Sequence, residues 1–92
     1  MAGRLLFDWD EANVGHIARH GITPVEAEGV IRAADVVAEN IRQGESRAVV
    51  VGETASGRTL VVVFTTRGDR IRVVTAYPAN RSQRARYRKR GR

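Results

Sequence analysis

Residues 67–92 of this 92-residue chain read RGDRIRVVTAYPANRSQRARYRKRGR. From Arg70 to Tyr77 the stretch largely alternates charged or polar residues with apolar ones. This period of two predicts a strand with one buried face. The two faces would carry Ile71, Val73 and Thr75 on one side, and Arg70, Arg72, Val74 and Ala76 on the other.

The residues that flank this strand predict where it begins and ends. Arg67-Gly68-Asp69 is typical of a tight turn, and Pro78 ends the strand because it has no amide hydrogen for the ladder. Asn80 can cap a helix, and seven basic residues and no acidic one follow it. We therefore expect an arginine-bearing strand that leads into a basic C-terminal helix.

Composition predicts a single small domain over residues 1–92. Apolar residues make up 42% of the chain, only five residues are aromatic, and cysteine is absent. The core is therefore expected to be mainly aliphatic, with no disulfide and no thiolate metal site. Neither a signal peptide nor a membrane span is evident, since the longest apolar run is residues 60–64. We expect a cytoplasmic protein.

Charge is segregated between the two halves of the chain. Residues 1–46 carry four basic and eight acidic side chains, a balance of −4, whereas residues 47–92 carry twelve and two, a balance of +10. Fifteen of the sixteen basic residues are arginine, which makes bidentate contacts with phosphate. The second half is therefore expected to bind a polyanion such as RNA, or an acidic protein.

Two helices are expected in the first half, after a short edge strand at residues 4–8. Asp8 or Asp10 can cap a helix over residues 10–20, with Glu11 completing a capping box from Asp8. Gly21 is typical of a helix end, with Ile22 placed for a Schellman motif. Thr23, Pro24 and Glu26 then form a strong start for a second helix that runs to about residue 34.

A β-meander is expected to follow these helices. Residues 36–38 suit a short strand, residues 40–45 a loop, and residues 47–53 and 58–66 two strands joined by a turn at 54–57. The run Val61-Val62-Val63 indicates a central strand that is buried on both faces. The fold class is therefore α+β, with two N-terminal helices packed on an antiparallel sheet of three to four strands and a basic C-terminal helix.

Arg70 and Arg72, in the strand expected at residues 70–77, suit contacts with a phosphate of the expected polyanion. If that polyanion is RNA, cutting it without a metal requires a proton acceptor, a proton donor and cations around the charged transition state. Arg70 and Arg72 should share one sheet face, where Arg81 and Arg84 could join them around one phosphate. Alternatively, Arg70 and Arg72 only solvate an open face or pair with Glu26 or Glu28.

His16 and His20 are the side chains suited to proton exchange near neutral pH. Their spacing of four puts them on one helix face, but no third zinc ligand is evident and no HExxH pattern surrounds them. His20 also has a plain structural role, because a helix C-terminus favours a cation. Tyr77 and Tyr87 suit either a contact with RNA or a cover for the sheet.

Several motifs in order resemble the BrnT family. They are residues 7–10 (FDWD), 19–22 (RHGI) and 67–76 (RGDRIRVVTA), followed by an arginine-rich end with Tyr87. This resemblance implies a RelE-like fold and a metal-independent ribonuclease toxin that inhibits translation. It also implies a BrnA-like ribbon-helix-helix antitoxin as partner, RNA, possibly mRNA, as substrate, and no cofactor.

We expect the catalytic residues to be His20, Arg70, Arg72 and Tyr77, and the RNA-binding residues to be Arg67, Arg81, Arg84 and Arg88. Three positions depart from the family pattern. Asn13 stands where lysine is typical, Tyr77 where arginine is frequent and Gln83 where glutamate is common. Two alternatives stay open: a nucleic-acid-binding module without catalysis, and a protein-binding domain that uses the basic C-terminal helix.

Overall fold

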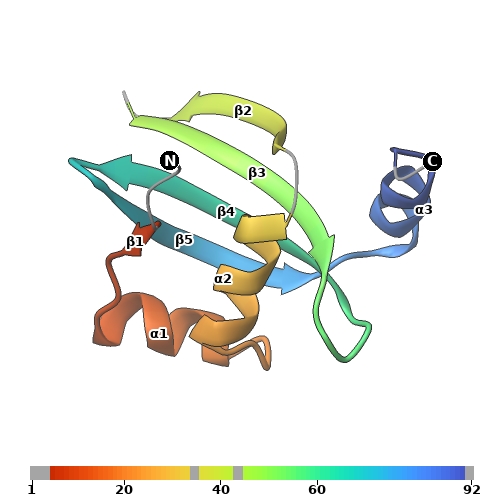
Figure 1. Ribbon diagram of the computed structural model, residues 1–92, viewed down its shortest axis with the longest axis horizontal. Coiled ribbons are helices and arrows are strands. Elements are labelled where there is room, and N and C mark those ends of the chain that lie inside the picture. The colour runs from red at the N-terminus through yellow and green to blue at the C-terminus, as the bar shows by residue number, and fades with distance from the viewer. Residues whose placement is uncertain (1–4, 34–35, 43–44, 91–92) are drawn as a thin grey trace.

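Three helices and a five-stranded sheet make up the fold (Figure 1). The computed structural model describes residues 5–33, 36–42 and 45–90. The elements in chain order are β1 (Leu6–Phe7), α1 (Glu11–Ala18), α2 (Pro24–Ala33), β2 (Val36–Arg42), β3 (Glu45–Glu53), β4 (Thr59–Arg67), β5 (Arg70–Pro78) and α3 (Arg81–Arg90). The predicted α+β class, with two N-terminal helices and a basic C-terminal helix, agrees with this arrangement.

The sheet is mixed rather than antiparallel, and it has five strands rather than three to four. Its order is β1-β5-β4-β3-β2, with antiparallel pairing throughout except between β1 and β5. β1 pairs in parallel with β5, with Leu6 opposite Arg70. The predicted loop at residues 40–45 was also wrong, because residues 40–42 and 45 belong to strands β2 and β3. Residues 43–44 lie outside the described part of the chain.

Helix boundaries follow from side chains that satisfy free backbone groups. Asp10, not Asp8, caps α1, and its capping box closes on Asn13 instead of Glu11. The predicted Schellman ending is confirmed, because Gly21 has φ of 73° and the Ile22 amide donates to the carbonyl of residue 17 at 3.2 Å.

The second capping box is also as predicted. The Glu26 amide donates to Thr23 Oγ1 at 3.2 Å, and the Thr23 amide donates to Glu26 Oε1 at 3.0 Å. These two reciprocal bonds fix the first turn of α2.

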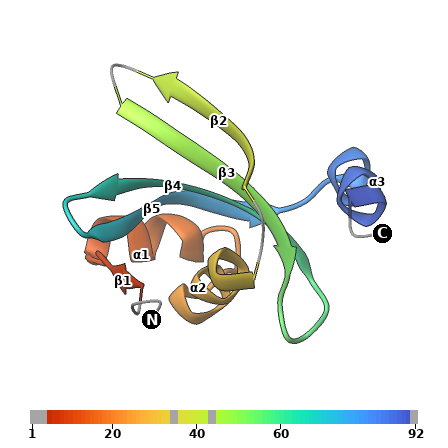
Figure 2. The same cartoon turned by 45° about the horizontal axis from the view of Figure 1, so that its top comes forward.

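Helices α1 and α2 cover one face of the sheet and bury the main core between the two layers (Figure 2). The fully buried members of this core are aliphatic, as the composition predicts: Ile17, Ala27, Val30, Leu60, Val62 and Ala76. Phe7 and Trp9 pack against it. Val61, next to Val62, is buried on the other face, so the prediction of a central strand is confirmed for β4.

A bulge in β5 breaks the predicted alternation. The register against β4 shifts between Val63, which opposes Thr75, and Phe64, which opposes Val73. One extra residue is thereby accommodated on β5, and side chains beyond it change faces. Val73 and Ala76 consequently belong to the same core, although the strict period of two put them on opposite faces.

Helix α3 lies at the end of β5 that is far from the β4–β5 turn (Figures 1 and 2). Asn80 caps it as predicted, and the box closes on Gln83, whose amide donates to Asn80 Oδ1 at 2.8 Å. Tyr87 attaches the helix to a small second core on the face opposite α1 and α2, formed by Val51, Val61 and Ala79. Glutamine serves a capping box as well as glutamate, so the departure at Gln83 has a structural role.

Asn13 ties α1 to the edge of β5. Its side-chain amide donates to the carbonyls of Asp8 at 3.0 Å and of Val73 at 3.2 Å, and its Oδ1 accepts from the Asp10 amide at 2.8 Å. Only 5% of Asn13 is exposed. A lysine could not supply this set of bonds, which gives the departure at position 13 a physical reason.

We expect Asn13→Ala to lower the free energy of unfolding by on the order of 2 kcal/mol or more, because buried backbone groups lose their partners. Urea denaturation followed by circular dichroism measures the loss. Glu11→Ala, an exposed change in the same turn, is the control and should cost about 0.5 kcal/mol or less. Equal losses in the two variants would refute the role given to Asn13.

Candidate active site

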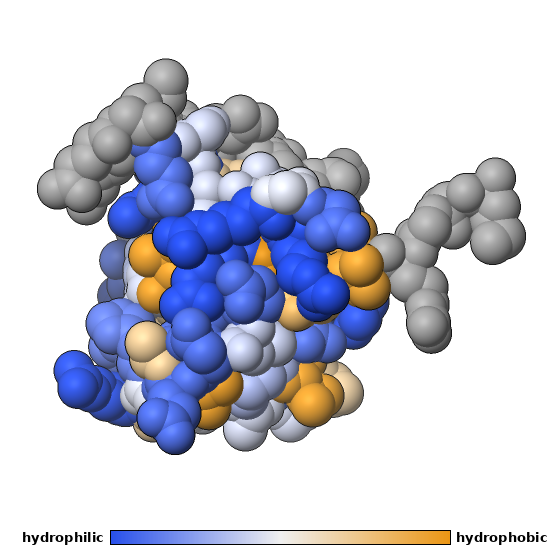
Figure 3. Space-filling model, turned by 90° about the vertical axis from the view of Figure 1, so that its left-hand side faces the viewer, coloured by the Kyte–Doolittle hydropathy of each residue, from blue (hydrophilic) through white to orange (hydrophobic). Residues whose placement is uncertain are grey.

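A basic hollow lies on the face of the sheet that points away from the main core, which we call the open face, and α1 borders it at the edge of β5. Its volume is about 250 Å³. The lining residues come from α1, β3, β4 and β5: Ala12, Asn13, His16, Glu45, Arg47, Thr65, Arg67, Arg72, Val73 and Val74. In Figure 3, which views the end of the molecule that carries the β4–β5 turn, strongly hydrophilic side chains crowd together. The hollow is smaller than most small-molecule pockets, which run from about 300 to 1,000 Å³, and suits a phosphodiester.

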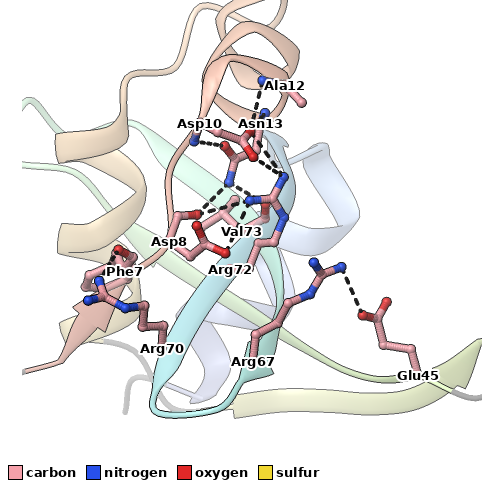
Figure 4. A network of polar contacts seen from close by, with 10 residues as sticks. All are labelled: Phe7, Asp8, Asp10, Ala12, Asn13, Glu45, Arg67, Arg70, Arg72 and Val73. Carbon is pink, nitrogen blue, oxygen red and sulfur yellow. Dashed lines mark hydrogen bonds and ion pairs between the residues drawn. The ribbon is translucent and has the colours of Figure 1, made fainter.

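Arg72 is held in place by two carboxylates (Figure 4). Its Nη1 lies 3.5 Å from Asp8 Oδ2, and its Nη2 lies 3.1 Å from Asp10 Oδ2. Only 16% of the Arg72 side chain is exposed. Asp10 is also the N-cap of α1, so one residue fixes both the start of the helix and the guanidinium.

The pKa shifts of Asp10 and Arg72 both show that the pair stabilises the two charged forms. The hydrogen bond from Arg72, with help from the Asn13 backbone amide, lowers the pKa of Asp10 below its ordinary value of 3.8. The same hydrogen bond, with the charges of Asp10 and Asp8, raises the pKa of Arg72. Arg72 is therefore a permanently charged donor whose position is set before any ligand arrives.

Glu45 forms a looser ion-pair cluster across the hollow. Its carboxylate lies 3.3 Å from Arg47 Nε and 3.8 Å from Arg67 Nη2. The Arg67 side chain is 59% exposed, and exposed pairs of this kind contribute only about 0–1 kcal/mol. Arg67 can therefore exchange Glu45 for a phosphate at small cost.

His16, rather than His20, lines the hollow. The His16 Nε2 atom lies 3.0 Å from Thr75 Oγ1. His20 stands behind it, with its ring centroid 6.0 Å from that of His16 and 6.4 Å from that of Tyr77. The structure thus brings together Arg67, Arg72 and one histidine, but that histidine is the one not assigned from the sequence.

The remaining predicted residues lie elsewhere. Arg70 does not line the hollow, and its nearest described polar contact is the Phe7 carbonyl at 3.5 Å. Tyr77 is five residues from Arg72. Because of the bulge the two positions oppose Val61 and Thr65, which are four residues apart on β4, so they lie about 13 Å apart along a strand that rises about 3.3 Å per residue.

Helix α3, with Arg81, Arg84 and Arg88, begins still farther along, beyond Pro78. The expectation that Arg81 and Arg84 join Arg70 and Arg72 around one phosphate was therefore wrong, because β5 separates them. Within the described residues, Arg72 pairs with Asp8 and Asp10 rather than with Glu26 or Glu28.

Sequence reasoning missed Glu45 and Arg47. The interval 40–45 reads as a loop because it is polar, so the strand appeared to begin at Arg47. A strand that begins at Glu45 places Glu45, Arg47 and Val49 on one face by its period of two. That face also carries Val51, which packs on the open face. The alternation at 45, 47, 49 and 51 was present in the sequence, but it can be recognised only when the strand is taken to begin at Glu45.

Two absences apply to the part of the chain that the structure describes. There, no three histidine, aspartate or glutamate side chains gather closely enough to hold a metal ion. None of the described helices has the length and apolar character needed to cross a membrane.

A family model described as the ribonuclease toxin, BrnT, of type II toxin–antitoxin systems matches residues 9–83. The match includes every residue that lines the hollow. It ends within the first turn of α3. No curated protein matches the chain.

Asp10→Asn tests the ion pair without removing the helix cap, since asparagine caps as well as aspartate. Because the folded pKa of Asp10 lies below 3.8, the pair stabilises the fold above that pH, and this contribution is lost as the pH falls through the lower folded value. We expect wild type to unfold at a higher temperature than Asp10→Asn at pH 7, with the difference shrinking toward pH 2.

Thermal unfolding at pH 7, 4, 3 and 2 measures this difference. Glu26 also has a lowered pKa, through the Thr23 amide and Arg58, but it titrates equally in both proteins and cancels. A difference that does not change with pH would show that the Asp10–Arg72 pair does not stabilise the fold.

Proposed function

Because this chain belongs to the BrnT family of ribonuclease toxins of type II toxin–antitoxin systems, we propose that it cuts RNA in the hollow of the open face. The observation that carries this proposal is the convergence of three arginines, one carboxylate and one histidine on a space of phosphodiester size. These are the groups that RNA cleavage without a metal requires: a proton acceptor, a proton donor and cations.

The proposed reaction is attack of a ribose 2′-hydroxyl on the adjacent phosphorus. The 2′-oxygen loses its proton and forms a bond to phosphorus, while the bond from phosphorus to the 5′-oxygen breaks. The leaving 5′-oxygen takes up one proton, so one proton is removed and one is returned. The products are a 2′,3′-cyclic phosphate and a 5′-hydroxyl.

Glu45 and His16 are the proposed acid–base pair. Glu45 is the carboxylate within the hollow, and its side chain is 32% exposed, so a ribose hydroxyl can reach it. His16 lies on the wall formed by α1, where Thr75 Oγ1 holds its Nε2 at 3.0 Å. We assign proton removal to Glu45 and proton return to His16, in place of His20.

The arginines divide between a fixed and a mobile role. Arg72 is immobilised by Asp8 and Asp10 and is suited to charge that grows in the transition state, because its donors need no reorganisation. Arg67 and Arg47 pair weakly with Glu45 and are suited to holding the substrate phosphate. When they engage phosphate, they also release the Glu45 carboxylate for proton removal.

The family membership extends this proposal to the biological role. We propose a RelE-like toxin that acts on RNA in the cytoplasm, needs no metal and inhibits translation, with mRNA as its target. We further propose that a BrnA-like ribbon-helix-helix antitoxin neutralises it. Helix α3 supports a macromolecular partner, since six of its ten residues are basic, none is acidic, and Tyr87 is its anchor in the second core.

A nucleic-acid-binding module without catalysis is the second candidate. It is favoured by the fact that each arginine of the hollow already has a carboxylate partner, while the basic residues of α3 lie outside the hollow. The two candidates differ in one outcome: the module binds RNA but leaves it uncut.

Arg72→Ala should lower the rate of RNA cleavage by on the order of 100-fold or more, because one preorganised donor to the transition state is lost. Affinity for uncut RNA should fall much less, since Arg47 and Arg67 remain. Single-turnover cleavage and filter binding measure the two effects. Arg70→Ala is the matched comparison, and its rate should fall far less because Arg70 lies outside the hollow. If Arg70→Ala and Arg72→Ala lower the cleavage rate equally, Arg70 also belongs to the catalytic site and its exclusion here is wrong.

His16→Ala should lower the cleavage rate and flatten the limb of the pH–rate profile that reports the protonated acid. The profile is measured under single-turnover conditions between pH 5 and 9. Glu11→Gln, on the same helix but outside the hollow, is the control. If His20→Ala flattens that limb and His16→Ala does not, the assignment made from the sequence is correct and the one made here is wrong.

A further inference from the structure

A row of side chains continues from the hollow along β5 toward α3. It begins at Arg72, passes His16 with its partner Thr75, and continues to His20 and Tyr77. The ring centroids of His16 and His20 are 6.0 Å apart, and those of His20 and Tyr77 are 6.4 Å apart. The row therefore leads from the hollow, through His16 and His20, to Tyr77, which packs against the second core of the open face.

Tyr77 packs against the second core while part of it stays accessible. Its side chain packs against the cluster of Val51, Val61 and Ala79, and it is half-buried there. Its partner strand position is Val61, on the central strand β4. A half-buried aromatic ring on a rigid strand is the kind of surface on which proteins stack the bases of single-stranded nucleic acid.

The geometry of the rings leaves room for a base. The two ring pairs meet at 70° and 64°, so they are edge-on rather than stacked in parallel. An edge-on pair leaves at least one ring face uncovered by its neighbour. His20 is exposed, which gives a base access from the solvent side.

Arginines lie at both ends of the row, those of the hollow with carboxylate partners. Arg67 and Arg72 stand at one end, and Arg81, Arg84 and Arg88 follow Pro78 at the other. Arg72 and Tyr77 oppose Thr65 and Val61, which are four residues apart on β4, so about 13 Å separates them along the sheet. A single strand of about four nucleotides or fewer covers that distance, even at the spacing of about 3.4 Å that phosphates have along one strand of a duplex. A nucleic acid strand of that length would meet cations at each end and rings between them.

We propose that Tyr77, flanked by His20, is a base-stacking subsite for single-stranded RNA that runs along β5 from the hollow to α3. This proposal rests on the proposed function for the identity of its ligand. It gives Tyr77 a binding role a few nucleotides from the cut phosphate instead of a role in the chemical step. It also explains how basic residues too distant to share one phosphate with Arg72 act on the same substrate.

The test uses uncleavable 2′-O-methyl octanucleotides, so that binding is measured independently of catalysis. Tyr77→Leu removes the ring but keeps an apolar side chain for the second core, and Tyr77→Phe keeps the ring. We expect Tyr77→Leu to weaken binding by on the order of tenfold, and Tyr77→Phe to bind within about twofold of wild type, since stacking does not need the hydroxyl. Fluorescence anisotropy gives the affinities, and circular dichroism confirms folding.

A scan with one abasic position per octanucleotide locates the stacked base. In wild type, one or two abasic positions should weaken binding by a similar factor, whereas in Tyr77→Leu the same positions should have little further effect, as a double-mutant cycle requires. Unchanged affinity of Tyr77→Leu, or additive losses in the cycle, would overturn the subsite. So would a Tyr77→Leu variant that keeps its RNA affinity and loses the antitoxin, because the surface would then serve a protein.

Cleavage separates this subsite from the proposed function. An unmodified octanucleotide that wild type binds but does not cut would refute the ribonuclease, while the anisotropy results would still decide the subsite. If Tyr77→Leu and Tyr77→Phe both lower kcat and leave KM unchanged, the phenolic hydroxyl acts in the chemical step and the stacking subsite is refuted.

Discussion

The contact of Arg72 with Asp8 and Asp10 is the interaction on which the site depends. It joins three parts of the fold: the segment after β1, the first turn of α1 and the open face of β5. Asp10 accepts from the amides of Ala12 and Asn13 with the same carboxylate. Helix initiation and guanidinium orientation are therefore one event, and the hollow cannot be assembled unless α1 is seated against the edge of the sheet.

Short-range patterns made most of the fold predictable. Capping residues and a glycine stop located α1 and α2. Apolar periodicity located β3 and β4, the two strands on either side of the turn at 54–57. The errors have identifiable physical causes. A two-residue strand such as β1 has too little periodicity to reveal its direction, and the bulge in β5 depends on pairing with β4 rather than on its own residues. The capping box closes on Asn13 rather than Glu11 because the cap is Asp10, and Asn13 stands three residues after it.

The site was predictable only in part, since it depends on which strands lie side by side. Arg67 and Arg72 stand out in the sequence because they belong to one basic, alternating stretch. Glu45, Arg47 and His16 come from distant segments, and only the order β5-β4-β3 and the position of α1 bring them to the same space. The arginines of α3 are close to Arg72 in the sequence, which led to the wrong prediction that they share one phosphate with it. The extended strand β5 separates them in space.

The junction of β1, Asn13 and β5 also protects one edge of the sheet against aggregation by strand addition. A free sheet edge is a template for another chain. β1 occupies that edge at Arg70 and Ile71, and the Asn13 amide takes the Val73 carbonyl, so this side offers no continuous row of backbone groups to a second strand. Strand exchange or strand addition is thereby directed to the opposite edge, β2. The β5 edge, which borders the hollow, is thereby protected from the addition of a second strand.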